Sequence, residues 1–72
     1  KRGVSMNKTA LRIKMLANND TGITLSKALN MSETTLSAKI NGKAEFTRNE
    51  IARIKERYNL NPKEIDNIFF TL

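Results

Sequence analysis

The stretch Thr24–Lys43, TLSKALNMSETTLSAKINGK, decides the fold of this chain. Its apolar residues recur at helical spacing on both sides of Asn30-Met31-Ser32, which predicts two short helices that meet at a steep angle. Such a pair needs a small residue inside its first helix, a turn residue that accepts a positive φ, and apolar anchors in both helices. The sequence supplies these as Ser26, as Asn30, and as Leu25, Leu29, Leu36 and Ile40. We therefore predict a helix-turn-helix over Thr21–Gly42.

Capping residues mark further helix starts along the chain. Thr47 followed by Glu50 has the pattern of a capping box, Asn61 followed by Glu64 repeats it, and Ser32 marks a looser start. These signals, together with apolar stripes at helical spacing, predict five helices: Lys8–Asn18, Gly22–Leu29, Glu33–Asn41, Arg48–Tyr58 and Pro62–Phe69. The expected fold class is therefore all-α, a compact bundle of about five short helices around a central helix-turn-helix.

Size and composition exclude several classes of protein. The 72 residues allow one domain, and no apolar run approaches the roughly 20 residues that a membrane-spanning helix needs. The absence of cysteine and histidine removes disulfides, thiolate and imidazole catalysis and the usual zinc ligands. We expect no enzyme activity, no metal, no cofactor and no small-molecule substrate. Residues 1–6 are expected to be a flexible N-terminal arm or a tag remnant, too short for a signal peptide, and residues 7–72 a single domain in the cytoplasm.

The positive charge is concentrated in the N-terminal part of the chain. Residues 1–43 contain eight lysines and arginines against two acids, whereas residues 44–72 contain five of each. The net charge of +6 therefore belongs to the N-terminal part, which is where a polyanion such as DNA would bind. The alternative is a solvated basic surface that only aids solubility.

The predicted second helix of the motif has a face that points away from its apolar anchors. At about 100° per residue, the residues opposite Leu36 and Ile40 are Thr34, Ser37, Ala38 and Asn41, with Glu33 at the N-terminal end. If this helix enters the major groove, these five residues would contact base edges. The candidates for phosphate contacts are the backbone amide at Thr21 and the side chains of Lys27, Lys39, Lys43 and Arg48.

The same stretch resembles the helix-turn-helix of small phage repressors of the Cro and CI type. The segment EFTRNEIARIKERYNLNPKEIDNIFF, residues 45–70, resembles the tail of Cro-like regulators from temperate phages of Gram-positive bacteria, which include modulators of repression. The resemblance implies a lambda repressor-like DNA-binding domain that regulates a lysis–lysogeny switch by binding double-stranded operator DNA in the bacterial host cell. Two positions depart from the family pattern: Asn30 replaces a frequent glycine, and Lys39 replaces a frequent apolar residue.

The composition of the candidate face also supports a second function. The face has no arginine or glutamine for bidentate base contacts, and it begins with the acidic Glu33. Such a face suits a protein partner, which would make the chain a modulator or antirepressor that binds the DNA-binding domain of a CI-type repressor. In the plainest interpretation, Thr34, Ser37 and Ala38 are only exposed helix residues and Glu33 stabilises the helix dipole.

The end of the chain offers two interpretations as well. Phe69 and Phe70 cannot both face one core from a single helix. Phe70 and Leu72 therefore either fold back onto the bundle or contribute to a homodimer interface, and a dimer would suit an operator with two half-sites.

Overall fold

The computed structural model describes residues 6–70, which form five helices. They are α1 (Lys8–Ala17), α2 (Gly22–Ala28), α3 (Glu33–Ile40), α4 (Arg48–Tyr58) and α5 (Pro62–Phe69). No β-strand occurs between residues 6 and 70, so the predicted all-α bundle is confirmed. Each helix begins at the predicted residue. The first three helices end one residue earlier than predicted, because the residue that follows each of them is a cap with non-helical backbone angles.

Reciprocal side-chain caps explain why α4 and α5 begin where they do. Thr47 Oγ1 accepts a hydrogen bond of 3.2 Å from the Glu50 amide, and Glu50 Oε1 accepts one of 2.9 Å from the Thr47 amide. Asn61 and Glu64 form the same pair, with distances of 2.8 and 3.0 Å. Each box satisfies two amides that a helix N-terminus would otherwise leave without partners. Both predicted capping boxes are therefore confirmed.

Left-handed residues end or follow four of the helices, α1 to α4. Asn30 has a φ of 59° in the connection between α2 and α3, as predicted, and Gly42 has a φ of 83° after α3. Asn19 and Asn59 adopt the same conformation, with φ of 56° and 53°. Asparagine and glycine tolerate this region better than other residues, so the chain can reverse direction sharply at each of these points.

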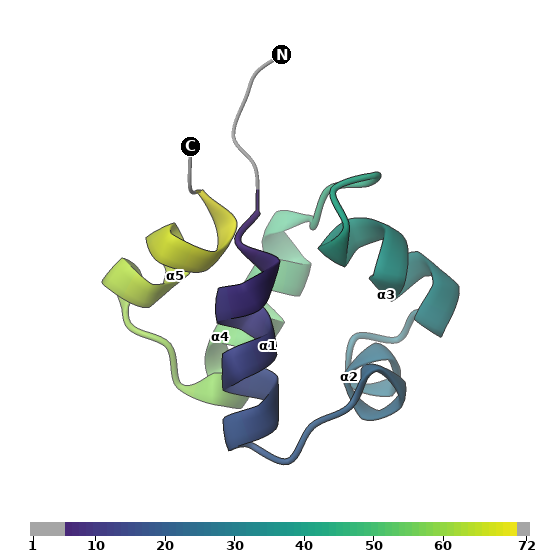
Figure 1. Ribbon diagram of the computed structural model, residues 1–72, viewed down its shortest axis with the longest axis horizontal. Helices are drawn as coiled ribbons and strands as arrows, with labels where there is room; N and C mark the ends of the chain where they lie inside the picture. The colour runs from purple at the N-terminus through teal and green to yellow at the C-terminus, as the bar shows by residue number, and fades with distance from the viewer. Residues whose placement is uncertain (1–5, 71–72) are drawn as a thin grey trace.

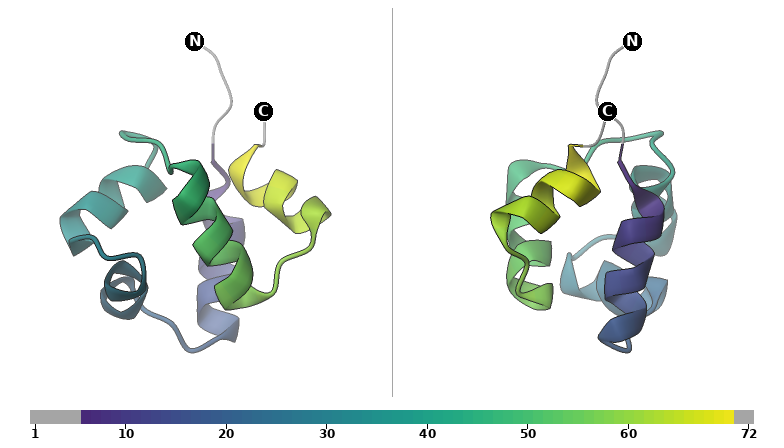
Figure 2. Two further views of the ribbon diagram at one scale, coloured as in Figure 1. Left: turned by 180° about the vertical axis from the view of Figure 1, so that it is seen from behind. Right: turned by 60° about the vertical axis from the view of Figure 1, so that its left-hand side comes forward.

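The five helices surround one apolar core. α1 lies between α5 on one side and α2 and α3 on the other (Figure 1). Seen from behind, α4 crosses in front of α1 and separates α3 from α5 (Figure 2). The buried apolar residues come from all five helices, from the α2 cap residue Leu29 and from Leu60; they are Leu11, Met15, Leu25, Leu29, Leu36, Ile40, Ile54, Tyr58, Leu60, Ile68 and Phe69.

The start of α1 is attached to α5. The Asn7 amide donates a hydrogen bond of 2.7 Å to the Ile68 carbonyl oxygen. Met6, which the sequence assigned to the arm, packs against the core, while the rest of the expected arm, residues 1–5, lies outside the described residues. Phe69 is buried and Phe70 is 50% exposed, whereas Leu72 lies outside the described residues. Within residues 6–70, no helix has the length and apolar character needed to cross a membrane.

Candidate nucleic-acid interface

Helix α3 lies on α2 with one side buried and the other accessible. Leu36 and Ile40 are buried, while Glu33, Thr34 and Ser37 are exposed. Asn41, the cap residue that follows α3, is also exposed, and Ala38 is half-buried. Buried and exposed residues alternate in this way because residues three or four positions apart lie on the same face of a helix.

All five residues of the candidate reading face line one open groove. The groove has a volume of about 700 Å³ and runs between α3 and α1. Its lining comprises Arg12, Met15, Gly22, Glu33, Thr34, Leu36, Ser37, Ala38, Ile40, Asn41 and Lys43. The structure therefore brings the predicted residues together and adds a second wall, α1, that sequence reasoning did not include.

Hydrogen bonds within the molecule hold the C-terminal end of this face in place. Asn41 Nδ2 donates to the Ser37 carbonyl oxygen at 2.9 Å and to Ser37 Oγ at 3.3 Å. Lys8 Nζ, from the start of α1, donates a longer hydrogen bond of 3.4 Å to Asn41 Oδ1. A nucleic acid or protein that contacts Asn41 would therefore meet a side chain whose orientation is already fixed.

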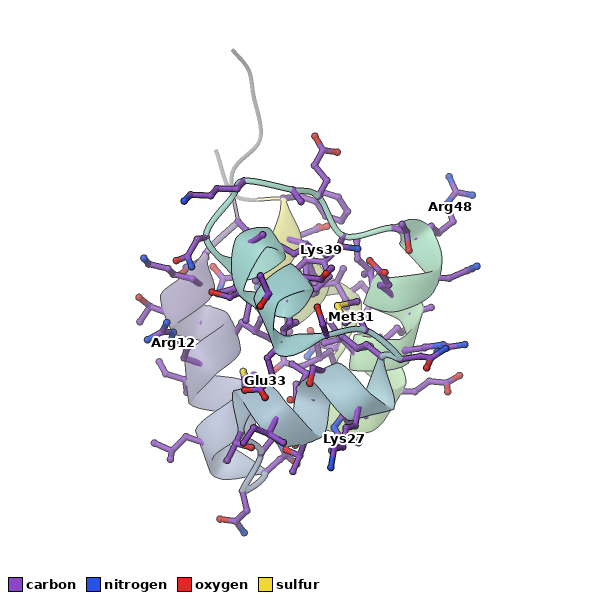
Figure 3. All side chains as sticks on the ribbon, turned by 90° about the vertical axis from the view of Figure 1, so that its right-hand side faces the viewer. Arg12, Lys27, Met31, Glu33, Lys39 and Arg48 are labelled. Carbon is purple, nitrogen blue, oxygen red and sulfur yellow. The ribbon has the colours of Figure 1, made fainter. Side chains whose placement is uncertain are left out.

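The side chains predicted to contact phosphates differ in their exposure to solvent and in their ion pairing. Lys27, Lys43 and Arg48 are exposed, and Figure 3 shows Lys27 and Arg48 reaching away from the body of the molecule. The Lys39 ammonium forms an ion pair of 2.6 Å with Glu50, and its side chain is only 12% exposed. It also lies 5.9 Å from the centre of the Phe46 ring. The Lys39 side chain therefore attaches α3 to α4 through this ion pair, and it is not free to contact a phosphate.

The Lys39–Glu50 pair influences the ionisation of Glu50. Burial by itself would raise the pKa of this carboxyl group, but hydrogen bonds from Lys39 and the Thr47 amide favour the charged form. The net result is a pKa below the ordinary value. Glu50 thus closes the cap of α4 and anchors the end of α3 with one carboxylate.

The backbone amide at Thr21 is already used within the molecule. It donates a hydrogen bond of 2.8 Å to Thr24 Oγ1, and the Thr24 amide donates one of 3.2 Å to Thr21 Oγ1. This capping box begins α2, and sequence reasoning missed it because threonine replaces the usual Glu or Gln at the third helical position. We leave the Thr21 amide out of the proposed phosphate contacts as well.

A buried carboxylate fixes the start of α2 against α4. Asp20, whose side chain is 3% exposed, accepts hydrogen bonds from Arg57 at 2.6 and 2.8 Å and from the Tyr58 hydroxyl at 2.5 Å. It also accepts one from the Thr24 hydroxyl. The Arg57 guanidinium holds the pKa of Asp20 well below its usual range, and burial together with the Asp20 charge raises the pKa of Tyr58.

No signal in the sequence predicted this cluster. Arg57 and Tyr58 lie 37 and 38 residues from Asp20 along the chain, and Asp20 itself occupies a loop position with no periodic pattern. Within residues 6–70, no group of three or more acidic, cysteine or histidine side chains is arranged to hold a metal ion.

Comparison with known proteins assigns the chain to one family. Residues 5–71 match the family described as "Protein of unknown function (DUF739)", and the chain belongs to that family. No curated protein matches the sequence.

Proposed function

We propose that the protein regulates transcription by binding double-stranded DNA, with α2 and α3 as a helix-turn-helix and α3 as the helix that enters the major groove. The observation that carries this proposal is how α3 is anchored. Leu36 and Ile40 anchor the helix in the core. Thr34, Ser37 and Asn41 line the same open groove. The +6 charge of the chain supports a polyanionic partner.

The chemistry of the face suits base edges of several kinds. The hydroxyls of Thr34 and Ser37 can donate or accept, and the Asn41 side-chain oxygen has a second lone pair with which it can accept. The Ala38 methyl group can contact a thymine methyl. Exposed Lys27, Lys43 and Arg48 would bind phosphates around this face. The resemblance to Cro-like regulators supports an operator of a phage lysis–lysogeny switch as the target.

Fluorescence anisotropy with labelled DNA that flanks the protein's own gene tests this function. We expect saturable binding, and we expect Thr34→Val to weaken it about fivefold, since one hydrogen bond contributes about 1 kcal/mol. Thr9→Val is the matched control, because Thr9 is also an exposed helix threonine but lies outside the lining of the groove. Absence of binding by the wild-type protein at low salt and high protein concentration would exclude the proposed function.

A second candidate function is binding to the DNA-binding domain of a CI-type repressor, as a modulator or antirepressor. Ile13 and Leu16 on α1 favour it, because these large apolar side chains are 61% and 78% exposed. They lie three residues apart and therefore share one side of the helix. Size-exclusion chromatography of the protein mixed with the repressor encoded beside it tests this function. A joint peak that Ile13→Asp abolishes would support it, and separate elution of the two proteins would exclude it.

We also propose that Phe70 contributes to a homodimer. Phe70 is 50% exposed at the end of α5, so a second copy of the chain could cover it, and a symmetric dimer would suit an operator with two half-sites. Sedimentation equilibrium should show a dimer that Phe70→Asp weakens. A wild-type protein that remains monomeric at high concentration would exclude the dimer.

A further inference from the structure

Arg12 lies on the wall of the groove that faces α3. It belongs to α1, and it lines the groove together with Thr34, Ser37 and Lys43. The side chain is exposed, and among residues 6–70 it takes part in none of the three ion pairs. By contrast, the next basic residue of α1, Lys14, is paired with Glu64 of α5. Arg12 is therefore available to a ligand that enters the groove.

The cations around α3 fall into two groups on opposite sides of the helix. Figure 3 shows Arg12 on one side of α3 and Arg48 on the other, with Lys27 below α3, on α2, toward the Arg48 side. Lys43 lines the groove with Arg12, and Lys8 reaches the same side through its hydrogen bond to Asn41. The polar residues of α3 thus lie between two basic borders.

We infer that these two borders bind the two backbones of one DNA duplex, and that Arg12 and Lys43 bind phosphates of the strand that lies in the α1–α3 groove. This inference rests on the proposed DNA-binding function and adds residues of α1 to it. A major groove about 12 Å wide has one phosphate backbone along each edge, so a helix inserted in it needs cations on both sides. The planar guanidinium of Arg12 matches two phosphate oxygens, which makes arginine well suited to this position.

Glu33 provides an internal check, because it lines the same groove as Arg12. A carboxylate close to a bound phosphate repels it, so this residue should oppose binding while Arg12 favours it. Neutral variants of the two residues must therefore change affinity in opposite directions if a phosphate backbone occupies the groove. A backbone that passes elsewhere would make both changes in affinity much smaller.

Salt titration of DNA binding tests the inference with the full chain. The probe is a labelled 20-base-pair duplex of the protein's own upstream DNA, together with one of its strands alone. We expect Arg12→Gln to weaken duplex binding about threefold to tenfold, and to reduce the slope of log affinity against log salt by about 0.9, the value for one phosphate contact. Arg12→Lys should keep most of the slope, and Glu33→Gln should bind the duplex about twofold to fivefold more tightly.

Lys63→Gln is the matched control. Lys63 is exposed at the start of α5, which lies on the other side of α1 from α3 (Figure 1), and its replacement removes the same charge. We expect a change in the salt slope well below that of Arg12→Gln. Equal slopes for the wild type and Arg12→Gln, with duplex binding intact, would overturn the assignment of Arg12 and leave the proposed function standing. If Arg12→Gln weakens binding to the duplex and to the single strand by the same factor, the two-backbone arrangement is overturned. If the wild-type protein does not bind the duplex, the proposed function itself is excluded.

Discussion

Replacing Asp20 with alanine should lower the free energy of unfolding by about 3 kcal/mol. The carboxylate is almost fully buried and accepts four hydrogen bonds, two from Arg57 and one each from Tyr58 and Thr24. Removing one partner of a buried charged pair costs about 3 to 5 kcal/mol, because the remaining charge loses its compensation. The Arg57 side chain keeps 37% of its exposure and so remains partly hydrated, which favours the lower end of this range.

The loss would be large for a domain of this size. At about 0.05 to 0.15 kcal/mol per residue, the chain is expected to have a total stability of about 4 to 11 kcal/mol. A loss of about 3 kcal/mol corresponds to a decrease in Tm of roughly 12 to 24 °C for a domain of this length. Tyr58→Phe removes a single hydrogen bond and keeps the ring in the core, so it should cost only about 1 to 2 kcal/mol.

Urea denaturation followed by circular dichroism at neutral pH measures both variants. Asp66→Ala is the control, because Asp66 is an exposed acid on α5 whose replacement should change stability by less than about 0.5 kcal/mol. If Asp20→Ala unfolds with the same midpoint as Asp66→Ala, the cluster contributes no net stability and the argument from burial is refuted. If Asp20→Ala is unfolded at the outset, the smaller effect of Tyr58→Phe still measures the cluster.

Three further predictions concern acid, the end of α3 and its entry turn. The folded-state pKa values of Asp20 and Glu50 lie below their ordinary values, so the unfolded chain takes up more protons than the folded chain on acidification. The urea concentration at the unfolding midpoint should therefore stay constant near neutral pH and decrease once the pH drops below about 4. A midpoint that does not change with pH would contradict this. Lys39→Met leaves the largely buried Glu50 carboxylate without its cation, so it should cost about 3 kcal/mol in urea denaturation and leave the salt slope of DNA binding unchanged, whereas a reduced slope would restore Lys39 as a phosphate contact. Asn30→Ala should lower stability by about 1 kcal/mol and Asn30→Gly by less than about 0.5, because φ is positive there; equal costs would show that the backbone is not strained.

The features that the sequence alone determined, the helix starts and the buried face of each helix, depend on interactions between residues close together in the chain. A cap and its partner, such as Thr47 and Glu50, lie three residues apart, so both halves of the signal are adjacent in the chain and the start of the helix can be predicted. The apolar period similarly selects the buried residues of each helix, including Leu36 and Ile40 of α3. The five helices, their starts and the exposed side of α3 follow from these short-range rules.

The tertiary structure decided which distant side chains meet. Asp20 pairs with Arg57 across 37 positions, Lys39 pairs with Glu50 in the next helix, and Arg12 of α1 shares a groove with the exposed side of α3. Charge alone does not distinguish Lys39 from Arg12 in the sequence, since both are basic residues on short helices. The tertiary structure distinguishes the two residues. The Lys39 ammonium is paired with a neighbouring carboxylate and cannot also bind a ligand, whereas the Arg12 guanidinium lies in an open groove and can.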